Sequence, residues 1–164
     1  MPRFKILQAE VDGIYVLKFI GEIRLNLCIT LEQVIENMLT NPKYKSVVID
    51  LSETEIIDST TLGLLARIAV AAKQRNGVIP TIISTNPDVT RIVKSMGFDR
   101  IFIIVGAPAS DIEQLMEIPL LDSTEDEVRQ NVIKAHRVLM DLNHRNQEEF
   151  RDLVAALENE CHQE

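Results

Sequence analysis

Residues 47–65 read VVIDLSETEIIDSTTLGLL, and this stretch decides the fold. Its first five residues form a short apolar run rich in β-branched side chains, which is typical of a strand covered on both faces. A short acidic loop follows, and Asp58-Ser59 then begins a run of Leu and Ala that predicts a helix to Gln74. A strand, a loop and a helix in this order predict one unit of a largely parallel α/β sheet.

Upstream of this unit, the sequence predicts a hairpin and a helix. Residues 3–10 and 14–20 are β-rich runs on either side of Asp12-Gly13, a dipeptide that favours a tight turn. Gly21-Glu22 is expected to end the second strand. Apolar residues then recur at helical spacing over residues 28–39.

Downstream, a strand is predicted over residues 79–83, with Pro80 near its start because proline cannot donate to a sheet interior. Asn86 and Pro87 are typical of the first positions of a helix, which is expected to stop at Gly97. Residues 101–105 form the last predicted strand. The order β-β-α-β-α-β-α-β therefore predicts a mixed, mostly parallel sheet with one antiparallel hairpin and helices packed on it.

The charge is divided unevenly along the 164 residues. The whole chain carries a net charge of −8. Residues 1–106 contain 12 basic and 11 acidic side chains, whereas residues 107–164 contain 5 basic and 14 acidic ones. This break falls at a Gly/Pro cluster, which predicts a domain over residues 1–106 and an acidic helical extension over 107–164.

The sequence of the extension predicts one long helix over about residues 125–160. Residues 122–127 offer a capping pattern and an acidic first turn, and apolar residues then recur at steps of three and four. The polar stretch 143–147 leaves open a bend or a break. The apolar stripe predicts packing against the chain's own domain or, as the alternative, docking or homodimerisation through this helix.

Composition excludes several classes of function. The negative charge argues against nucleic-acid binding. Cys28 and Cys161 lie far apart, which supports neither a disulfide framework nor a metal site. No apolar run approaches a membrane span, and the first residues lack a signal-peptide core, so we expect a cytoplasmic protein without direct membrane insertion. Six scattered glycines form no phosphate-binding loop, and no cofactor is expected.

Ser/His catalysis is not expected either. His136, His144 and His162 all lie in the extension, and the sequence has no Gly-x-Ser-x-Gly motif. His136 and His144 are predicted to occupy ordinary helix positions. We therefore expect no catalytic residue.

Ser59 has two interpretations. In the simpler one, Asp58 or Ser59 only caps the helix. In the other, Ser59 is a phosphorylation site. A phosphate there would lie at the positive end of the helix dipole and place about −2 charge on a binding surface.

Residues 58–63 (DSTTLG) resemble the signature of the STAS domain, named for sulphate transporters and anti-sigma factor antagonists. Residues 21–23 (GEI), 86–92 (NPDVTRI) and 96–99 (MGFD) agree with it in order and spacing. The resemblance covers about residues 3–106 and favours the anti-sigma factor antagonist branch. It departs from the common family pattern at Arg24, where relatives usually carry Asp, and at Thr61, where many carry Gly.

The resemblance implies a non-enzymatic partner switch in a bacterial pathway. The unphosphorylated domain would bind an anti-sigma factor, often a serine kinase with a GHKL-type ATP site, and so control sigma-factor-dependent transcription. Phosphorylation at Ser59, with Thr60 as the second candidate, would release the partner, and a PP2C-type phosphatase would reset the switch. The expected partner-binding residues are Glu22, Arg24, Asp58, Ser59, Thr60, Thr61, Leu62, Asn86 and Met96.

The alternative function belongs to another class. The same fold could serve as a STAS subunit of a membrane transport complex or as a small-ligand or nucleotide sensor module. An exposed Ser at position 59 would favour switching, whereas a basic pocket that holds a nucleotide would favour the sensor.

Overall fold

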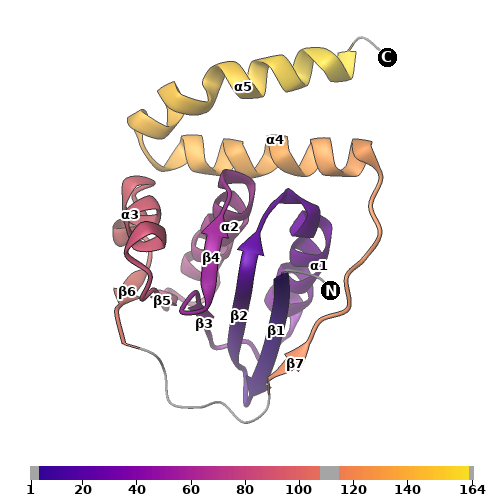
Figure 1. The fold of residues 1–164 in the computed structure, drawn as a ribbon. Helices are drawn as coiled ribbons and strands as arrows, with labels where there is room; N and C mark the ends of the chain where they lie inside the picture. The colour runs from indigo at the N-terminus through magenta and orange to yellow at the C-terminus, as the bar shows by residue number, and fades with distance from the viewer. Residues whose placement is uncertain (1–3, 108–114, 163–164) are drawn as a thin grey trace.

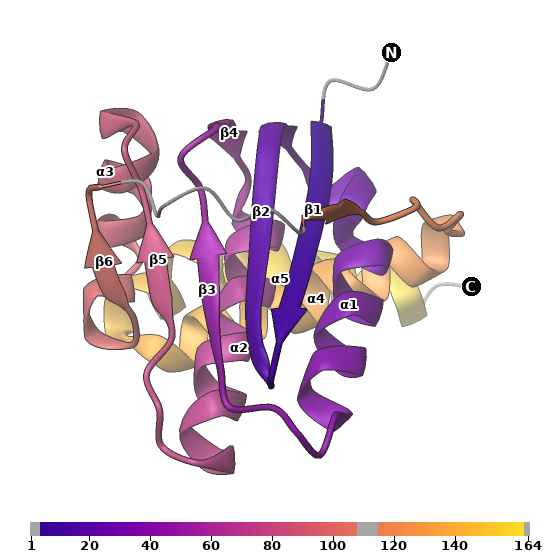
Figure 2. The same ribbon diagram turned by 90° about the horizontal axis from the view of Figure 1, so that it is seen from below.

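A mixed β-sheet forms the centre of the computed structural model, which describes residues 4–107 and 115–162. Its strands are β1 (Phe4–Val11), β2 (Ile14–Ile23), β3 (Ser46–Asp50), β4 (Thr54–Ile57), β5 (Thr81–Ile83), β6 (Ile103–Val105) and β7 (Met116–Glu117). They lie in the order β6-β5-β3-β2-β1-β7, and β4 pairs with β2 (Figure 2). The pairs of β1 with β2 and with β7 are antiparallel, and the others are parallel.

The hairpin between β1 and β2 turns at Asp12 and Gly13, as the sequence predicts. Both residues have positive φ, 52° and 86°, which is the backbone that a tight two-residue hairpin requires. A Cβ on Gly13 would also lie 1.8 Å from the carbonyl oxygen of Lys43, so only glycine fits. The prediction that β2 ends at Gly21-Glu22 is wrong. The strand continues to Ile23 because its last residues pair with β4 across a register shift.

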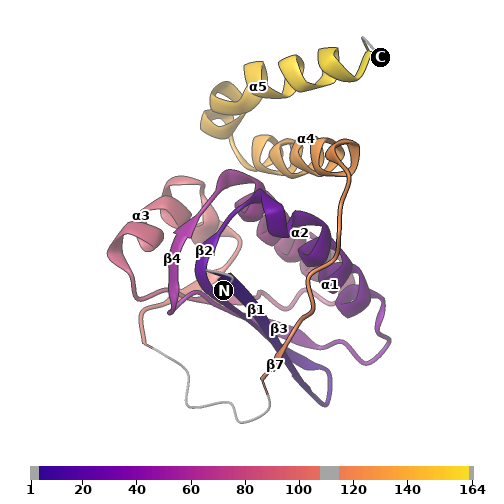
Figure 3. The ribbon, with the colours of Figure 1, turned by 45° about the vertical axis from the view of Figure 1, so that its right-hand side comes forward.

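In the described part of the chain, five α-helices accompany the sheet: α1 (Cys28–Thr40), α2 (Ser59–Arg75), α3 (Pro87–Ser95), α4 (Glu125–Leu142) and α5 (His144–His162). Short 3₁₀ turns precede α1 (Leu25–Leu27) and follow α3 (Phe98–Arg100). Figures 1 and 3 show α1 and α2 against one face of the sheet, α4 lying across them, and α5 stacked on the outer side of α4. The predicted α/β fold with a mixed sheet is therefore confirmed.

Two strands were not predicted. Residues 54–57, expected as part of a loop, form β4, in which Thr54 and Ile57 are buried while the two residues between them are exposed. Thr54 is held by a hydrogen bond from its hydroxyl to the carbonyl of Phe19, 2.8 Å away. The other strand, β7, adds two residues of the extension to the free edge of β1.

The extension forms two helices, so the prediction of one helix over 125–160 is wrong, and the break that the polar stretch left open is present. Asn143 has extended backbone dihedrals and accepts a hydrogen bond from the backbone N–H of Asn146 at 2.8 Å, which starts α5 in a new direction. α5 then folds back along α4, and an ion pair joins Arg137 to Glu158.

The extension packs on its own domain. The largest fully buried side chains belong to the domain, among them Phe19 of β2 and Phe98 of the 3₁₀ turn after α3. Ala135 and Leu139 of α4 and Phe150 of α5 belong to the same core cluster. The hydrophobic core therefore runs from the sheet through α2 into the extension.

Candidate functional site

The N-terminus of α2 is built by Asp58, which links β4 to the helix. Its backbone N–H donates to the carbonyl of Ile23 at 3.1 Å, which fixes the loop to the end of β2. Its side-chain Oδ1 accepts from both the backbone N–H and the hydroxyl of Thr61, at 2.9 and 2.8 Å. Asp58 is therefore the N-cap, and Ser59 is the first residue of the helix.

The hydroxyl of Ser59 meets a histidine of the extension. Ser59 Oγ lies 2.8 Å from Nε2 of His136 in α4. The other ring nitrogen, Nδ1, lies 2.7 Å from the carbonyl oxygen of Val132, which can only accept. In the neutral ring, Nδ1 therefore carries the proton, and Nε2 accepts the hydrogen bond that Ser59 donates.

His136 is enclosed from both sides. Its side chain is 1% exposed. The ring of Phe150 in α5 packs edge-on against it, with ring centres 4.9 Å apart and planes at 69°. The prediction that His136 occupies an ordinary helix position is wrong, since the residue lies between the domain and α5. His144 does lie on the surface, beside Glu148.

A serine bonded to a histidine is also the arrangement of a nucleophile and its base. The sequence places every histidine in the extension, and the fold brings one of them, His136, to Ser59. The ring is oriented here by the Val132 carbonyl rather than by a carboxylate, and α4 and α5 cover it. The pair thus joins the half-buried Ser59 of α2 to the buried ring of His136 in α4.

The residues after Ser59 face inward. Thr60, Thr61 and Leu62 are 3%, 1% and 1% exposed. Of the two candidate hydroxyls, Ser59 is the more accessible one. Gly63 comes next and lies directly under α4, where a Cβ would be 2.2 Å from the carbonyl oxygen of Ala135. The absence of a side chain at Gly63 is what allows α2 and α4 to approach so closely.

Glu22 and Arg24 lie beside this helix terminus. Glu22 is in register with Ile56 of β4. The guanidinium of Arg24 is exposed and lies 3.8 Å from the Glu22 carboxylate. The positive charge at position 24 is thus adjacent to a carboxylate on the same strand end.

Asn86 and Met96 mark the two ends of α3. Asn86 is its N-cap and accepts from the backbone N–H of Asp88 at 3.0 Å. The carbonyl of Met96 accepts from the side-chain amides of Asn143 and Asn146, at 3.2 and 2.9 Å. Of the predicted partner-binding residues, Ser59 and Met96 are therefore hydrogen-bonded to the extension.

Cys28 opens α1 and is 1% exposed. Burial, with a smaller contribution from the nearby Asp58 carboxylate, raises the pKa of its thiol to about 11. Cys28 is therefore a protonated core residue rather than a nucleophile. The side chain of Cys161 lies outside the described residues.

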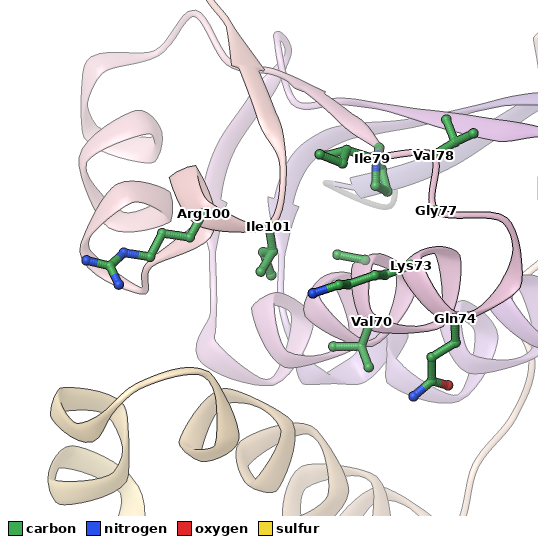
Figure 4. A pocket seen from close by; sticks show the side chains of 10 residues that line it. Val70, Lys73, Gln74, Gly77, Val78, Ile79, Arg100 and Ile101 are labelled. Carbon is green, nitrogen blue, oxygen red and sulfur yellow. The ribbon is translucent and has the colours of Figure 1, made fainter.

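A groove of about 660 Å³ lies at the opposite end of α2 from Ser59. Val70, Val78 and Ile79 form apolar walls, and Lys73 contributes a cation (Figure 4). Arg100 lines one end, but its guanidinium points away from Val78 and Ile79 in this view. The groove is therefore separate from the Ser59 surface.

Within the described ranges, no group of His, Cys, Asp and Glu side chains could hold a metal ion. None of the helices in the described part of the chain is long and apolar enough to cross a membrane.

Comparisons with known proteins agree with the fold. The model of the STAS domain family matches residues 5–114. An anti-sigma factor antagonist from Mycobacterium paratuberculosis is 23% identical with a TM-score of 0.55, over 79% of this chain and 93% of that one. The anti-sigma factor antagonist SpoIIAA in its unphosphorylated form is 13% identical with a TM-score of 0.54, over 60% and 85%. The NMR structure of the protein TM1081 is 26% identical with a TM-score of 0.52, over 60% and 78%. No curated protein matches the chain.

Proposed function

Because the chain belongs to the STAS domain family, we propose that it is an anti-sigma factor antagonist that is switched by phosphorylation of Ser59. The unphosphorylated chain binds an anti-sigma factor or switch kinase of the bacterial cytoplasm, and phosphorylation releases that partner. The chain itself is the substrate of the kinase and of a PP2C-type phosphatase.

One observation carries this proposal: Ser59 is the first residue of α2, directly after its cap. Asp58 satisfies the backbone N–H of Thr61, and Ser59 is left with its hydroxyl free of any capping bond within the helix. A phosphate at this position would meet the positive end of the helix dipole. It would leave the hydrogen bonds of the sheet unchanged while it adds about −2 charge to the surface.

The expected partner surface surrounds this hydroxyl. Glu22 and Arg24 lie at the end of β2, whose Ile23 carbonyl holds the cap residue in place. The Arg24 guanidinium and the acidic cap give the surface both signs of charge. We infer that a partner binds to this surface of mixed charge and that a phosphate weakens the complex by charge repulsion.

The test begins with two variants of the full chain. Ser59→Ala keeps position 59 uncharged and is expected to hold the partner whether or not ATP is present. Ser59→Asp is expected to weaken binding at least tenfold. Ser123→Asp is the matched control, since it adds the same charge at an exposed position before α4.

Partners retained by Ser59→Ala but not by Ser59→Asp are identified by quantitative mass spectrometry of captured lysate proteins. The purified partner is then incubated with the wild-type chain and ATP, and the modified residue is mapped. A phosphate on Ser59 and loss of the complex support the proposal. Equal binding of both variants, or modification elsewhere alone, overturns it.

A further inference from the structure

The extension covers the same part of α2 that the proposed switch must expose. α4 lies across α2, and α5 lies outside it (Figures 1 and 3). We propose that α4 and α5 form an intramolecular cover of the Ser59 surface, and that docking of α4 and phosphorylation of Ser59 exclude one another. This inference rests on the proposed function and names how its site is regulated.

The first support is the contact at Ser59 itself. Its Oγ and Nε2 of the His136 ring are in direct hydrogen-bond contact, 2.8 Å apart. A phosphoryl group on Oγ would replace the proton of this hydrogen bond and bring its bulk and charge against the ring. The ring cannot withdraw, because Phe150 packs against it and the Val132 carbonyl holds its other nitrogen. The phosphate therefore requires α4 to move.

The second support is the crossing of the helices at Gly63 and Ala135. The nearest atoms to a Cβ on Gly63 are the carbonyl oxygen, carbonyl carbon and Cβ of Ala135, at 2.2, 2.5 and 2.7 Å. Two of these are backbone atoms, which cannot turn aside as a long side chain can. While α4 is docked, it excludes any partner from this turn of α2.

A third contact fixes the corner between α4 and α5. The amides of Asn143 and Asn146 both donate to the Met96 carbonyl, and the Asn146 amide also donates to the Leu139 carbonyl at 2.9 Å. The cover thus touches the ends of two different helices of the domain, α2 and α3. Both are among the places where the sequence predicts partner contacts.

The connection to the domain permits the cover to leave. Residues 119–124, between β7 and α4, form neither helix nor strand and are exposed, and the backbone N–H of Leu121 donates to the hydroxyl of Thr30 at 2.9 Å, a bond that an opening of the cover has to break or pivot on. α5 is joined to α4 by the ion pair between Arg137 and Glu158 and by Phe150. The two helices can therefore move as one body on this segment. A partner that competes for α2 must displace these two helices. The apparent affinity of the partner is therefore its intrinsic affinity multiplied by the fraction of chains that are open.

Two substitutions open the cover from opposite sides. Gly63→Ala places a methyl group against the α4 backbone, and alanine is otherwise the better helix former inside α2. Ala135→Leu enlarges the α4 side and leaves the whole α2 surface unchanged. Ala155→Leu is the control, because it makes the same change at an exposed position of α5.

The first measurement needs no partner: hydrogen exchange of residues 133–139, followed by mass spectrometry of the full chain. Gly63→Ala, Ala135→Leu and Ser59→Asp are each expected to speed exchange there at least tenfold, whereas Ala155→Leu is not. Exchange of the sheet strands serves as the folding control. Unchanged exchange in Ser59→Asp, with faster exchange in the two opening variants, overturns the mutual exclusion.

The second measurement uses the partner found above. Ala135→Leu is expected to bind it about tenfold more tightly than the wild type, and to be phosphorylated faster, since more chains are open. Faster exchange without tighter binding overturns the cover but leaves the Ser59 switch standing. Equal binding of Ser59→Ala and Ser59→Asp would instead overturn the switch, whatever the exchange shows.

Discussion

Ser59 and His136 are separated by 77 positions in the sequence and by 2.8 Å between Oγ and Nε2 in the structure. This bond joins the first residue of α2 to the middle of α4. It couples the candidate modification site to the extension. The strength of that coupling can be measured directly.

A double-mutant cycle isolates the Ser59–His136 bond. Ser59→Ala removes the donor, and His136→Phe removes the acceptor while it keeps a ring for Phe150 to contact. Because the His136 ring is buried, we expect a coupling energy of about 1 kcal/mol in the free energy of unfolding, measured by urea denaturation.

The control cycle pairs Ser59→Ala with His144→Phe. His144 lies on the surface of α5 beside Glu148, away from this contact, so the two effects are expected to add. Additive effects in the Ser59–His136 cycle as well would contradict the proposed bond.

Gly97→Ala tests the second anchor of the extension. Gly97 has φ 87°, and a Cβ there would lie 2.7 Å from the side-chain amide nitrogen of Asn143. That amide must then release the Met96 carbonyl. We expect a loss of about 2–3 kcal/mol in the free energy of unfolding, from backbone strain and the lost hydrogen bond.

Gly77→Ala separates the two causes. Gly77 follows α2 with a similar φ of 76°, but a Cβ on it would meet nothing within 4 Å. Its substitution should therefore cost only the strain, about 1–2 kcal/mol. Equal losses for the two variants would show that the Asn143 contact contributes nothing to stability.

Asp58 is expected to act through its oxygen acceptor rather than its charge. Asp58→Ala leaves the backbone N–H and the buried hydroxyl of Thr61 without their acceptor, so we expect a loss of about 2 kcal/mol. Asp58→Asn keeps an acceptor oxygen and should stay within about 0.5 kcal/mol of the wild type. Thermal unfolding measures both, and an Asn variant as unstable as the Ala variant would assign the effect to charge.

Local rules account for what the sequence predicts well. The turn at Asp12-Gly13, the cap at Asn86, and the cap that the sequence left between Asp58 and Ser59 and that the structure gives to Asp58, each depend on a few neighbouring residues. β4 was missed because its pairing with β2 passes through a register shift. β7 was missed because two residues carry no periodicity, and their pairing with β1 depends on residues more than 100 positions away.

His136 shows the same division, at the candidate site, between what neighbouring residues predict and what tertiary packing decides. It lies four positions after Val132 and three before Leu139, on the apolar stripe of α4. A polar side chain on such a stripe must find a hydrogen-bond partner when it is buried. That signal could have predicted burial of His136. It could not have identified Ser59, because only the tertiary packing of α4 on α2 brings the two together.

Cys28 provides a prediction for pH dependence. Its pKa of about 11 in the folded chain exceeds the ordinary value of 9.0, because burial disfavours the thiolate. The folded state therefore keeps a proton that the unfolded state releases between these values. The stability that this group contributes is fully present below about pH 9 and is lost as the pH rises toward 11.

Comparison of the chain with its Cys28→Ala variant, both in a Cys161→Ser background, isolates this effect. Burial also raises the pKa of the Tyr44 hydroxyl, so Tyr44 contributes its own pH dependence. Because both chains retain Tyr44, its contribution cancels in the difference between them. The stability advantage of Cys28 over Ala is expected to shrink between pH 9 and 11 in urea titrations. In the folded chain at pH 8, the thiol should also resist a disulfide reagent until urea unfolds the protein. A stability advantage of Cys28 over Ala that stays constant from pH 9 to 11, or rapid reaction of the thiol in the folded chain, would contradict this prediction. Either result would show that water reaches position 28 at the start of α1.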